Sequence, residues 1–294
     1  MKKEEIEKTR KAGGIVRTVK KNTREWIKSG MLLKEIAEKI ESEIEKLGGK
    51  LAFPVNLGIN EYTAHYTPSY DEETKAEGLL KVDFGVQIDG FTADNAFSID
   101  LENSEENKKL IEASEKALES AIESVKKKNN LGEIGNEIQK IAEKYKFSPI
   151  RNLSGHRIKQ WDLHSAPTIP NYHNNNSHVL EDGIYAIEPF ITIGVGMVYD
   201  GKPSGIYEVK KSAAIRDSNA REIFNYIVEN YQTLPFCSRW LVKKFGTRAL
   251  LSLSLIEKTG ALHQFSQLIE KSKAKVAQTE HTIIIHEGKV EVVT

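Results

Sequence analysis

The chain contains a single cysteine, Cys237, among its 294 residues. One thiol cannot build an internal disulfide framework, and so few cysteines are typical of a reducing compartment. No stretch approaches the roughly 18 apolar residues that a membrane-spanning helix requires. The N-terminal segment MKKEEIEKTRKAGG also lacks the apolar centre of a secretory signal peptide. We therefore expect a globular cytoplasmic protein with no membrane partner.

An excess of charge of either sign is also absent, because 42 basic residues balance 42 acidic ones. This balance gives no overall basic field, so the composition does not indicate a nucleic-acid partner. The length is sufficient for a large core, arranged as one big domain or as two modest ones.

Residues 82–100, VDFGVQIDGFTADNAFSID, read as two alternating strands joined by a tight turn at Asp89-Gly90. Pairing around that turn places Gly85 opposite Asp94. It also puts the side chains of Asp83 and Asp94 on the same face of the hairpin. The two aspartates become diagonal neighbours, about 7–8 Å apart at the backbone, and Gly85 leaves room for their carboxylates to converge. Unpaired carboxylates at this spacing repel each other. The face is therefore either solvated or a site for a hard cation, which favours oxygen ligands.

The order of predicted elements occurs twice. Helical periodicity covers residues 3–28 and 32–47, strands follow to residue 101, and two further helices start after Asn103-Ser104 and near Leu131. The segment AHYTP around His65 resembles LHSAP around His164, and GLLKVDF resembles GIYAIEP, which matches Asp83 with Glu188. Each half thus supplies one histidine and one carboxylate. The pattern predicts an α+β fold with antiparallel strands and a site at a pseudo-symmetric centre.

Three more candidate ligands lie in the second half. Glu188 is predicted inside an apolar strand, Glu280 at the start of a terminal hairpin that turns at Glu287-Gly288, and His156 after a Ser-Gly turn. Alone, each is more often a structural residue. Together with Asp83 and Asp94 they make four carboxylates and one imidazole, which is enough for two divalent ions sharing bridging oxygens. Two-metal sites of this kind serve aminopeptidases and phosphatases.

The succession VDFG, a second aspartate eleven residues later, SGH, IEP and TEHT resembles the methionine aminopeptidase family. Longer blocks resemble its type II branch, namely LAFPVNLGINEYTAHYTP, GHRIKQWDLH, YAIEPFITIGVG, QTEHTIII and ENYQTLPFCSRWL. The resemblance runs from about residue 5 to the end of the chain.

This resemblance implies a pita-bread fold, with a pseudo-twofold antiparallel sheet core and outer helices. Residues 1–205 and 269–294 would form the catalytic domain. Residues 206–268 would form a helical, winged-helix-like insertion, with a helix capped at Asp217-Ser218 and a later one ended by Gly260. The insertion has no concentrated basic helix, so a DNA-binding role is not expected.

The resemblance also implies the role of each site residue. Asp83 would chelate one metal, His156 and Glu188 would hold the other, and Asp94 and Glu280 would bridge the two ions. A bridging hydroxide would attack, with Glu188 as the proton carrier. His65 and His164 would contact the scissile amide and stabilise the oxyanion. A methionine pocket would include Phe53, Leu163 and Phe265.

The expected cofactors are two divalent ions, for which Co, Mn, Fe and Zn are all acceptable. The expected activity is removal of the initiator methionine from nascent chains whose second residue is small. We expect nascent N-termini as partners, a transient ribosome contact at most, no specific nucleic acid, and a monomer. Two alternatives stay open: an X-Pro aminopeptidase or prolidase-like enzyme, and a non-catalytic relative that binds ribosomes or RNA.

Overall fold

The computed structural model describes residues 1–294 and shows helices packed around antiparallel sheets. The helices are α1 (Lys3–Trp26), α2 (Leu33–Lys46), α3 (Glu105–Lys126), α4 (Leu131–Lys144), α5 (Ser218–Tyr231), α6 (Ser238–Phe245) and α7 (Arg248–Glu257). The strands are β1 (Lys50–Leu51), β2 (Asn56–Ile59), β3 (Tyr62–Ala64), β4 (Leu79–Ile88), β5 (Phe91–Asp100), β6 (Ser148–Pro149), β7 (Ser154–Lys159), β8 (Asp162–Pro170), β9 (Gly183–Ile187), β10 (Phe190–Thr192), β11 (Val198–Val209), β12 (Phe236–Cys237), β13 (Leu262–Glu270), β14 (Val276–Gln278), β15 (His281–His286) and β16 (Lys289–Val292). This composition confirms the predicted α+β class.

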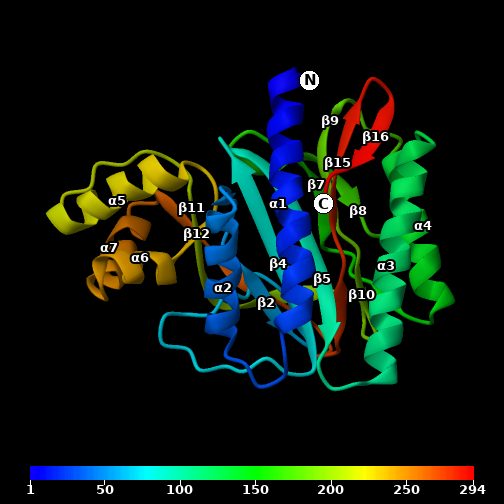
Figure 1. Cartoon of the computed structure of the whole chain (residues 1–294), viewed down its shortest axis with the longest axis horizontal. Helices are drawn as coiled ribbons and strands as arrows, with labels where there is room; N and C mark the ends of the chain where they lie inside the picture. The colour runs from blue at the N-terminus through cyan, green and yellow to red at the C-terminus, as the bar shows by residue number, and fades with distance from the viewer.

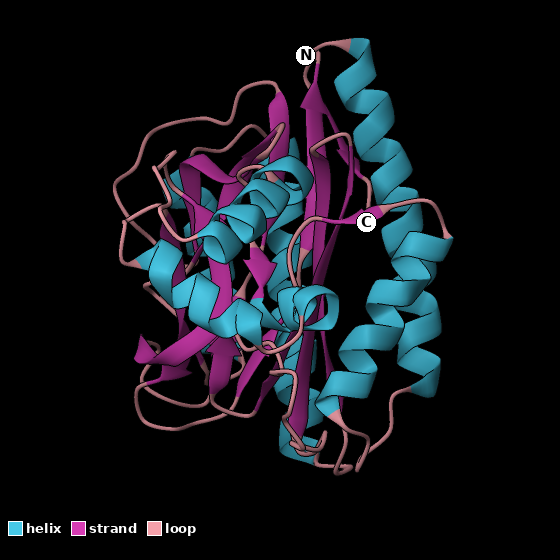
Figure 2. Ribbon diagram, turned by 90° about the vertical axis from the view of Figure 1, so that its left-hand side faces the viewer, coloured by secondary structure: helices cyan, strands magenta, loops and turns pink.

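The strands form four sheets in which every pairing is antiparallel. Their orders are β1-β4-β2 with β5 beside β4, β14-β10-β6, β12-β11-β13-β3 and β16-β15-β9-β7-β8. In Figure 1, α1 and α2 stand in front of β4 and β5, α3 and α4 lie at the right, and α5 to α7 gather at the left. Figure 2 shows the molecule from the side, with long helices lining one side of the strands.

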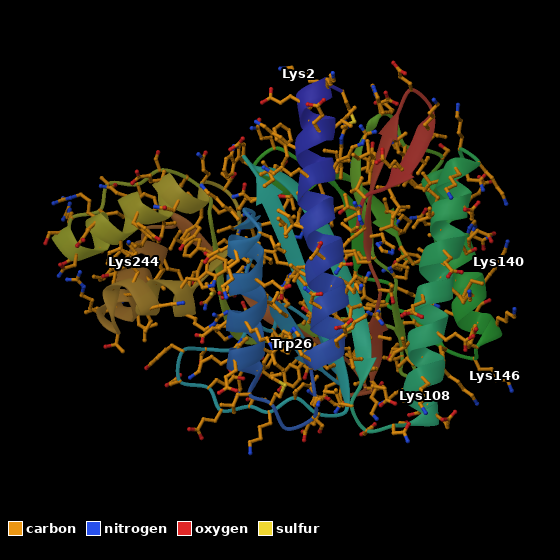
Figure 3. All side chains as sticks on the ribbon, viewed as in Figure 1. Lys2, Trp26, Lys108, Lys140, Lys146 and Lys244 are labelled. Atoms are coloured by element: carbon orange, nitrogen blue, oxygen red, sulfur yellow. The ribbon has the colours of Figure 1, made fainter.

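Two helix pairs bury their apolar stripes on separate sets of strands. The core under α1 and α2 includes Val16, Ile40 and Phe84 of β4. The core under α3 and α4 includes Leu118 and Tyr185 of β9. The predicted order of two helices followed by strands is therefore found twice along the chain. Charged side chains cover the outside of this shell, as the labelled lysines of α3, α4 and α6 do in Figure 3.

The helix boundaries follow the predicted signals closely. The Ser104 hydroxyl accepts a hydrogen bond from the Asn107 backbone N–H at 3.4 Å, so α3 begins where the capping pair Asn103-Ser104 was expected to start it. The Asp217 carboxylate accepts one from the Ala220 N–H at 2.8 Å and caps α5 in the same way. The first two helices are each slightly shorter than the predicted spans 3–28 and 32–47.

The β4–β5 hairpin has the predicted register. Ile88 pairs with Phe91, and Gly85 with Asp94, across a turn in which Asp89 and Gly90 have φ values of 50° and 81°. The proposed reason for Gly85 was wrong, because the space beside it does not lie open between the aspartates. A Cβ at this position would meet the Phe53 ring at 2.5 Å. Gly85 therefore makes room for an aromatic ring.

Two local predictions in the second half were also wrong. Glu188 does not lie inside a strand: β9 ends at Ile187, and the break coincides with Pro189, which has no N–H to donate to a ladder. His156 does not follow a turn, because Ser154 and Gly155 already belong to β7. A Cβ on Gly155 would lie 2.4 Å from the Ala186 carbonyl oxygen, so this glycine allows a close approach of two strands. The terminal hairpin turns at Glu287-Gly288, as predicted.

Helices α5 to α7 pack around a core of their own, which includes Phe224, Leu241 and Leu253. Gly260 lies just after α7 and has a left-handed φ of 74°. Its N–H donates a hydrogen bond to the Glu257 carbonyl oxygen, so this glycine ends the helix as expected. The division of the chain into domains at residues 206 and 268 stays a prediction.

No helix of the structure is both long and apolar enough to cross a membrane.

Candidate active site

One cavity of about 270 Å³ lies where the two halves and the α5–α7 segment meet. All ten residues that the sequence singled out line it: Phe53, His65, Asp83, Asp94, His156, Leu163, His164, Glu188, Phe265 and Glu280. They come from positions 53 to 280 of the chain. The fold therefore brings every predicted site residue to one place.

Five acidic and imidazole side chains crowd one end of this cavity. Ligand atoms of Asp94, His156 and Glu280 lie within 4.8 Å of one another. The His156 Nε2 atom is 3.8 Å from Asp94 Oδ2 and 3.7 Å from Glu188 Oε1. Asp83 lies diagonally across the hairpin from Asp94. The two nitrogen–oxygen separations exceed a hydrogen bond, so these groups converge without bonding to one another.

Burial controls the protonation of this cluster. It raises the pKa of Asp83 to about 7. Burial is also the main cause that raises the pKa of Asp94 and Glu280 well above the ordinary range, and neighbouring carboxylates add to it. The pKa of Glu188 rises for the same reasons. Burial lowers the pKa of His156 to about 4, so its imidazole is neutral at pH 7.

The donor set fits divalent cations. Asp83 Oδ1 and Glu280 Oε1 are buried and accept no hydrogen bond, and a buried carboxylate oxygen without a partner is costly. Four carboxylates and one neutral imidazole are ligands suited to Mn, Fe, Co or Zn. A bound cation would supply the missing partners and would offset the mutual repulsion of the acids.

Two further histidines face the same space. The His164 ring lies edge-on to the His156 ring, with centroids 4.6 Å apart. Burial lowers the pKa of His164 well below its ordinary value, and His156 adds to the effect. The His65 Nδ1 atom lies 3.2 Å from the Ser266 carbonyl oxygen, which fixes the orientation of that ring. Both imidazoles are thus held neutral beside the acidic cluster.

Part of the cavity wall is apolar. Phe53 and Leu163 pack with Leu234, which belongs to the loop after α5. Phe265 lies edge-on to His65 with ring centroids 5.1 Å apart. This part of the wall offers a slot for an apolar side chain beside the polar cluster.

Sequence reasoning missed two residues that support the ligands. The Thr282 hydroxyl accepts a hydrogen bond from the Asp94 N–H at 2.7 Å and donates one to the Asp94 carbonyl at 2.9 Å. The Gln278 side chain donates to Glu188 Oε2 at 3.4 Å. Thr282 lies two residues after Glu280 in the TEHT block. Side chains two residues apart on an extended chain share a face, and this spacing is the sequence signal for Thr282. Three polar residues of the cavity wall were also missed: Asn56, Asn152 and Ser154.

Comparison with known proteins places the chain among metallopeptidases. Residues 7–287 match metallopeptidase family M24. Over 297 aligned residues the chain is 40% identical to a methionine aminopeptidase of Methanocaldococcus jannaschii, with 100% of both chains covered. A methionine aminopeptidase of Pyrococcus abyssi is 42% identical, with 99% of each chain covered.

Among solved structures, a thermophilic Arx1 superposes with a TM-score of 0.87 at 16% identity, covering 100% of this chain and 91% of that one. Methionine aminopeptidase from Thermotoga maritima gives a TM-score of 0.72 at 24% identity, covering 100% of this chain and 98% of that one. At such low identity these two likenesses concern the fold alone, and they confirm the predicted pita-bread fold.

Proposed function

The chain belongs to metallopeptidase family M24, and we propose that it is a methionine aminopeptidase acting on nascent polypeptides whose second residue is small. It is a metal-dependent exopeptidase that removes N-terminal methionine. The observation that carries the proposal is the convergence of the acidic cluster, two neutral histidines and an apolar slot in one cavity. An N-terminal methionine presents three groups to such a cavity: a reacting amide, an amino group and an apolar side chain.

The proposed ligands are Asp83, Asp94, His156, Glu188 and Glu280. Together these residues would hold two divalent ions. When bound, divalent ions supply an activated water nucleophile and polarise a carbonyl oxygen. Thr282 holds the Asp94 backbone from both sides, so that carboxylate is presented in a fixed position.

The remaining chemistry belongs to side chains of the chain itself. Glu188 accepts the proton of the attacking water and delivers it to the leaving amine, acting first as a general base and then as a general acid. The neutral imidazoles of His65 and His164 contact the scissile amide and donate to the developing oxyanion. Burial of both rings keeps them uncharged for this role.

Substrate choice is proposed to come from the apolar part of the cavity wall. Phe53, Leu163 and Phe265 would surround the methionine side chain, and the thioether suits such an adaptable apolar contact. The cavity is small, which favours a small second residue.

We further propose that the enzyme works in the cytoplasm as a monomer and meets the ribosome only transiently.

Release of methionine from the tripeptide Met-Ala-Ser tests this proposal. The enzyme loaded separately with Mn, Fe, Co or Zn should release methionine and should leave an X-Pro dipeptide uncut. Faster hydrolysis of the X-Pro dipeptide would favour a prolidase-like enzyme instead. Loss of both activities with every metal would favour a non-catalytic relative. Metal analysis of protein purified without added ions would identify the ion and the number bound.

A further inference from the structure

Asn56 is a polar residue of the cavity wall to which the reaction described above gives no role. It begins β2, it is only 7% exposed, and it lines the cavity. Its partner across the antiparallel ladder is Asp83. Directly opposed residues of a strand pair point to the same face with Cβ atoms about 4.5–5.5 Å apart. Asn56 therefore faces the acidic cluster from a neighbouring strand.

The amide of Asn56 is only half satisfied. Its Nδ2 donates to the Pro54 carbonyl oxygen at 3.2 Å. A carbonyl oxygen can only accept a hydrogen bond, so the atom of the Asn56 side-chain amide that faces Pro54 must be the nitrogen. The Oδ1 atom is buried and has no hydrogen-bond partner. A buried acceptor without a donor is unfavourable. Because Asn56 lines the cavity, a molecule bound there is a source of the missing donor.

The chemistry of an N-terminal methionine limits what that donor can be. Its thioether has no hydrogen to donate, and its carbonyl oxygen only accepts. The two remaining donors are the N–H of the scissile amide and the α-amino group. The proposed function already gives the amide N–H to a histidine. Among the donors of the methionine residue itself, the α-amino group is therefore the one left for Asn56 Oδ1.

We propose that Asn56 Oδ1 accepts a hydrogen bond from the α-amino group of the substrate and so defines the end of the chain that the enzyme cuts. This inference rests on the proposed function. A neutral amide suits the task better than another carboxylate, because carboxylates at this face would be drawn into metal binding. An amino group held beside Asp83 places the first peptide bond, and no later one, over the acidic cluster.

Two ligands that differ only in the amino group test the inference. They are L-methionine and 4-(methylthio)butanoic acid, which lacks that group. Inhibition constants are measured against Met-Ala-Ser hydrolysis, with binding to the metal-loaded enzyme followed by calorimetry. In Asn56→Leu the acceptor is lost at similar volume. Methionine should bind about tenfold or more weakly, as for a hydrogen bond to a charged group. The deaminated ligand should change by less than about twofold on the same reasoning.

Asn152 provides the matched control. It also lines the cavity, but both ends of its amide are occupied by the Val198 N–H and carbonyl, at 2.9 Å and 2.8 Å. Asn152→Leu should therefore affect the two ligands equally. Asn56→Ala repeats the test with a smaller side chain if the leucine variant does not fold. Metal content is measured for every variant and should match that of the wild type.

Four outcomes would overturn the inference. An equal loss of affinity for both ligands in the Asn56 variants would assign the residue to cavity shape. A fall in metal content would assign it to the metal centre. Wild-type enzyme that releases methionine from Met-Ala-Ser but binds both ligands equally would refute the amino-group contact while leaving the proposed function intact. Failure to release methionine at all would remove the proposed function and this inference together.

Discussion

Arg239 and Glu41 are joined inside the protein by two parallel hydrogen bonds, of 2.8 Å from Nη1 and 2.7 Å from Nη2. The two side chains are only 3% and 9% exposed. Arg239 lies at the start of α6, and Glu41 lies on α2. The Arg239 Nε also donates to the Pro68 carbonyl oxygen at 3.1 Å, three residues after His65. One guanidinium thus ties the α5–α7 segment to the helix layer and to the loop beside the cavity.

Replacing Arg239 with alanine should strongly lower the free energy of unfolding. The Glu41 carboxylate would remain buried without its partner, a change that typically costs about 3–5 kcal/mol. Urea denaturation measures the effect. Arg10→Ala is the control, because the Arg10–Glu291 pair has side chains 53% and 43% exposed, and exposed pairs contribute less than about 1 kcal/mol. Equal losses in the two variants would contradict the importance of this buried contact.

Asp94→Ala should abolish both activity and tight metal binding. Asp94 is one of the proposed ligands, and its ligand atom lies within 4.8 Å of those of His156 and Glu280. Metal content by mass spectrometry and methionine release are measured on the same preparation. Asp89→Asn, in the exposed turn of the same hairpin, should keep both. Normal metal content and activity in Asp94→Ala would show that the ligand assignment is mistaken.

His164→Ala should fold and bind metal but turn over more slowly. Loss of one oxyanion donor lowers the rate by about 10²–10³. Steady-state rates with Met-Ala-Ser and calorimetric metal titration separate the two properties. The exposed His178 provides a control substitution that should change neither. A fall in metal content in His164→Ala would make this histidine a ligand.

Metal affinity should rise as the pH increases through about 7. Burial raises the pKa of Asp83 to about 7 and that of Asp94 in the same direction. In the metal-free protein these acids hold protons below that pH, and a cation must displace them, so binding releases protons and weakens in acid. Calorimetric titrations at pH 6 and pH 8, in buffers of different ionisation enthalpy, measure both effects. An affinity independent of pH, with no proton release, would contradict this protonation scheme.

The protein should retain Met1 when incubated with its own active form. The sequence begins Met1-Lys2, and a long charged side chain after the methionine would have to enter a small buried cavity and lose solvation there. A Lys2→Ala variant should lose Met1 under the same conditions. Intact-mass measurement distinguishes the two outcomes. Equal processing of both chains would show that the small-residue rule does not apply.

The sequence could predict those parts of the site whose signals are local. Alternation and the Asp89-Gly90 turn determine the β4–β5 register, because side chains on a strand alternate with a period of two. That register alone is sufficient to place Asp83 diagonal to Asp94. The duplicated segments also paired His65 with His164 correctly as residues of one cavity.

Contacts that join distant segments could not be predicted in this way. Thr282 supports Asp94 across 188 residues, and Phe53 fills the space beside Gly85. Neither contact leaves a periodic trace in the chain, because each depends on how separate elements pack. The break at Glu188 has a different character, because Pro189 marks it locally while the apolar residues on either side continue the pattern of a single strand.

The spread of the site along the chain affects the timing of activity during synthesis. Glu280 and Thr282 are made after every other member of the site, and the sheet that contains β15 cannot be completed before them. A growing chain exposes its own N-terminus long before it has these residues. Whatever processing the N-terminus of a new copy receives while that copy is being made must therefore come from a finished molecule.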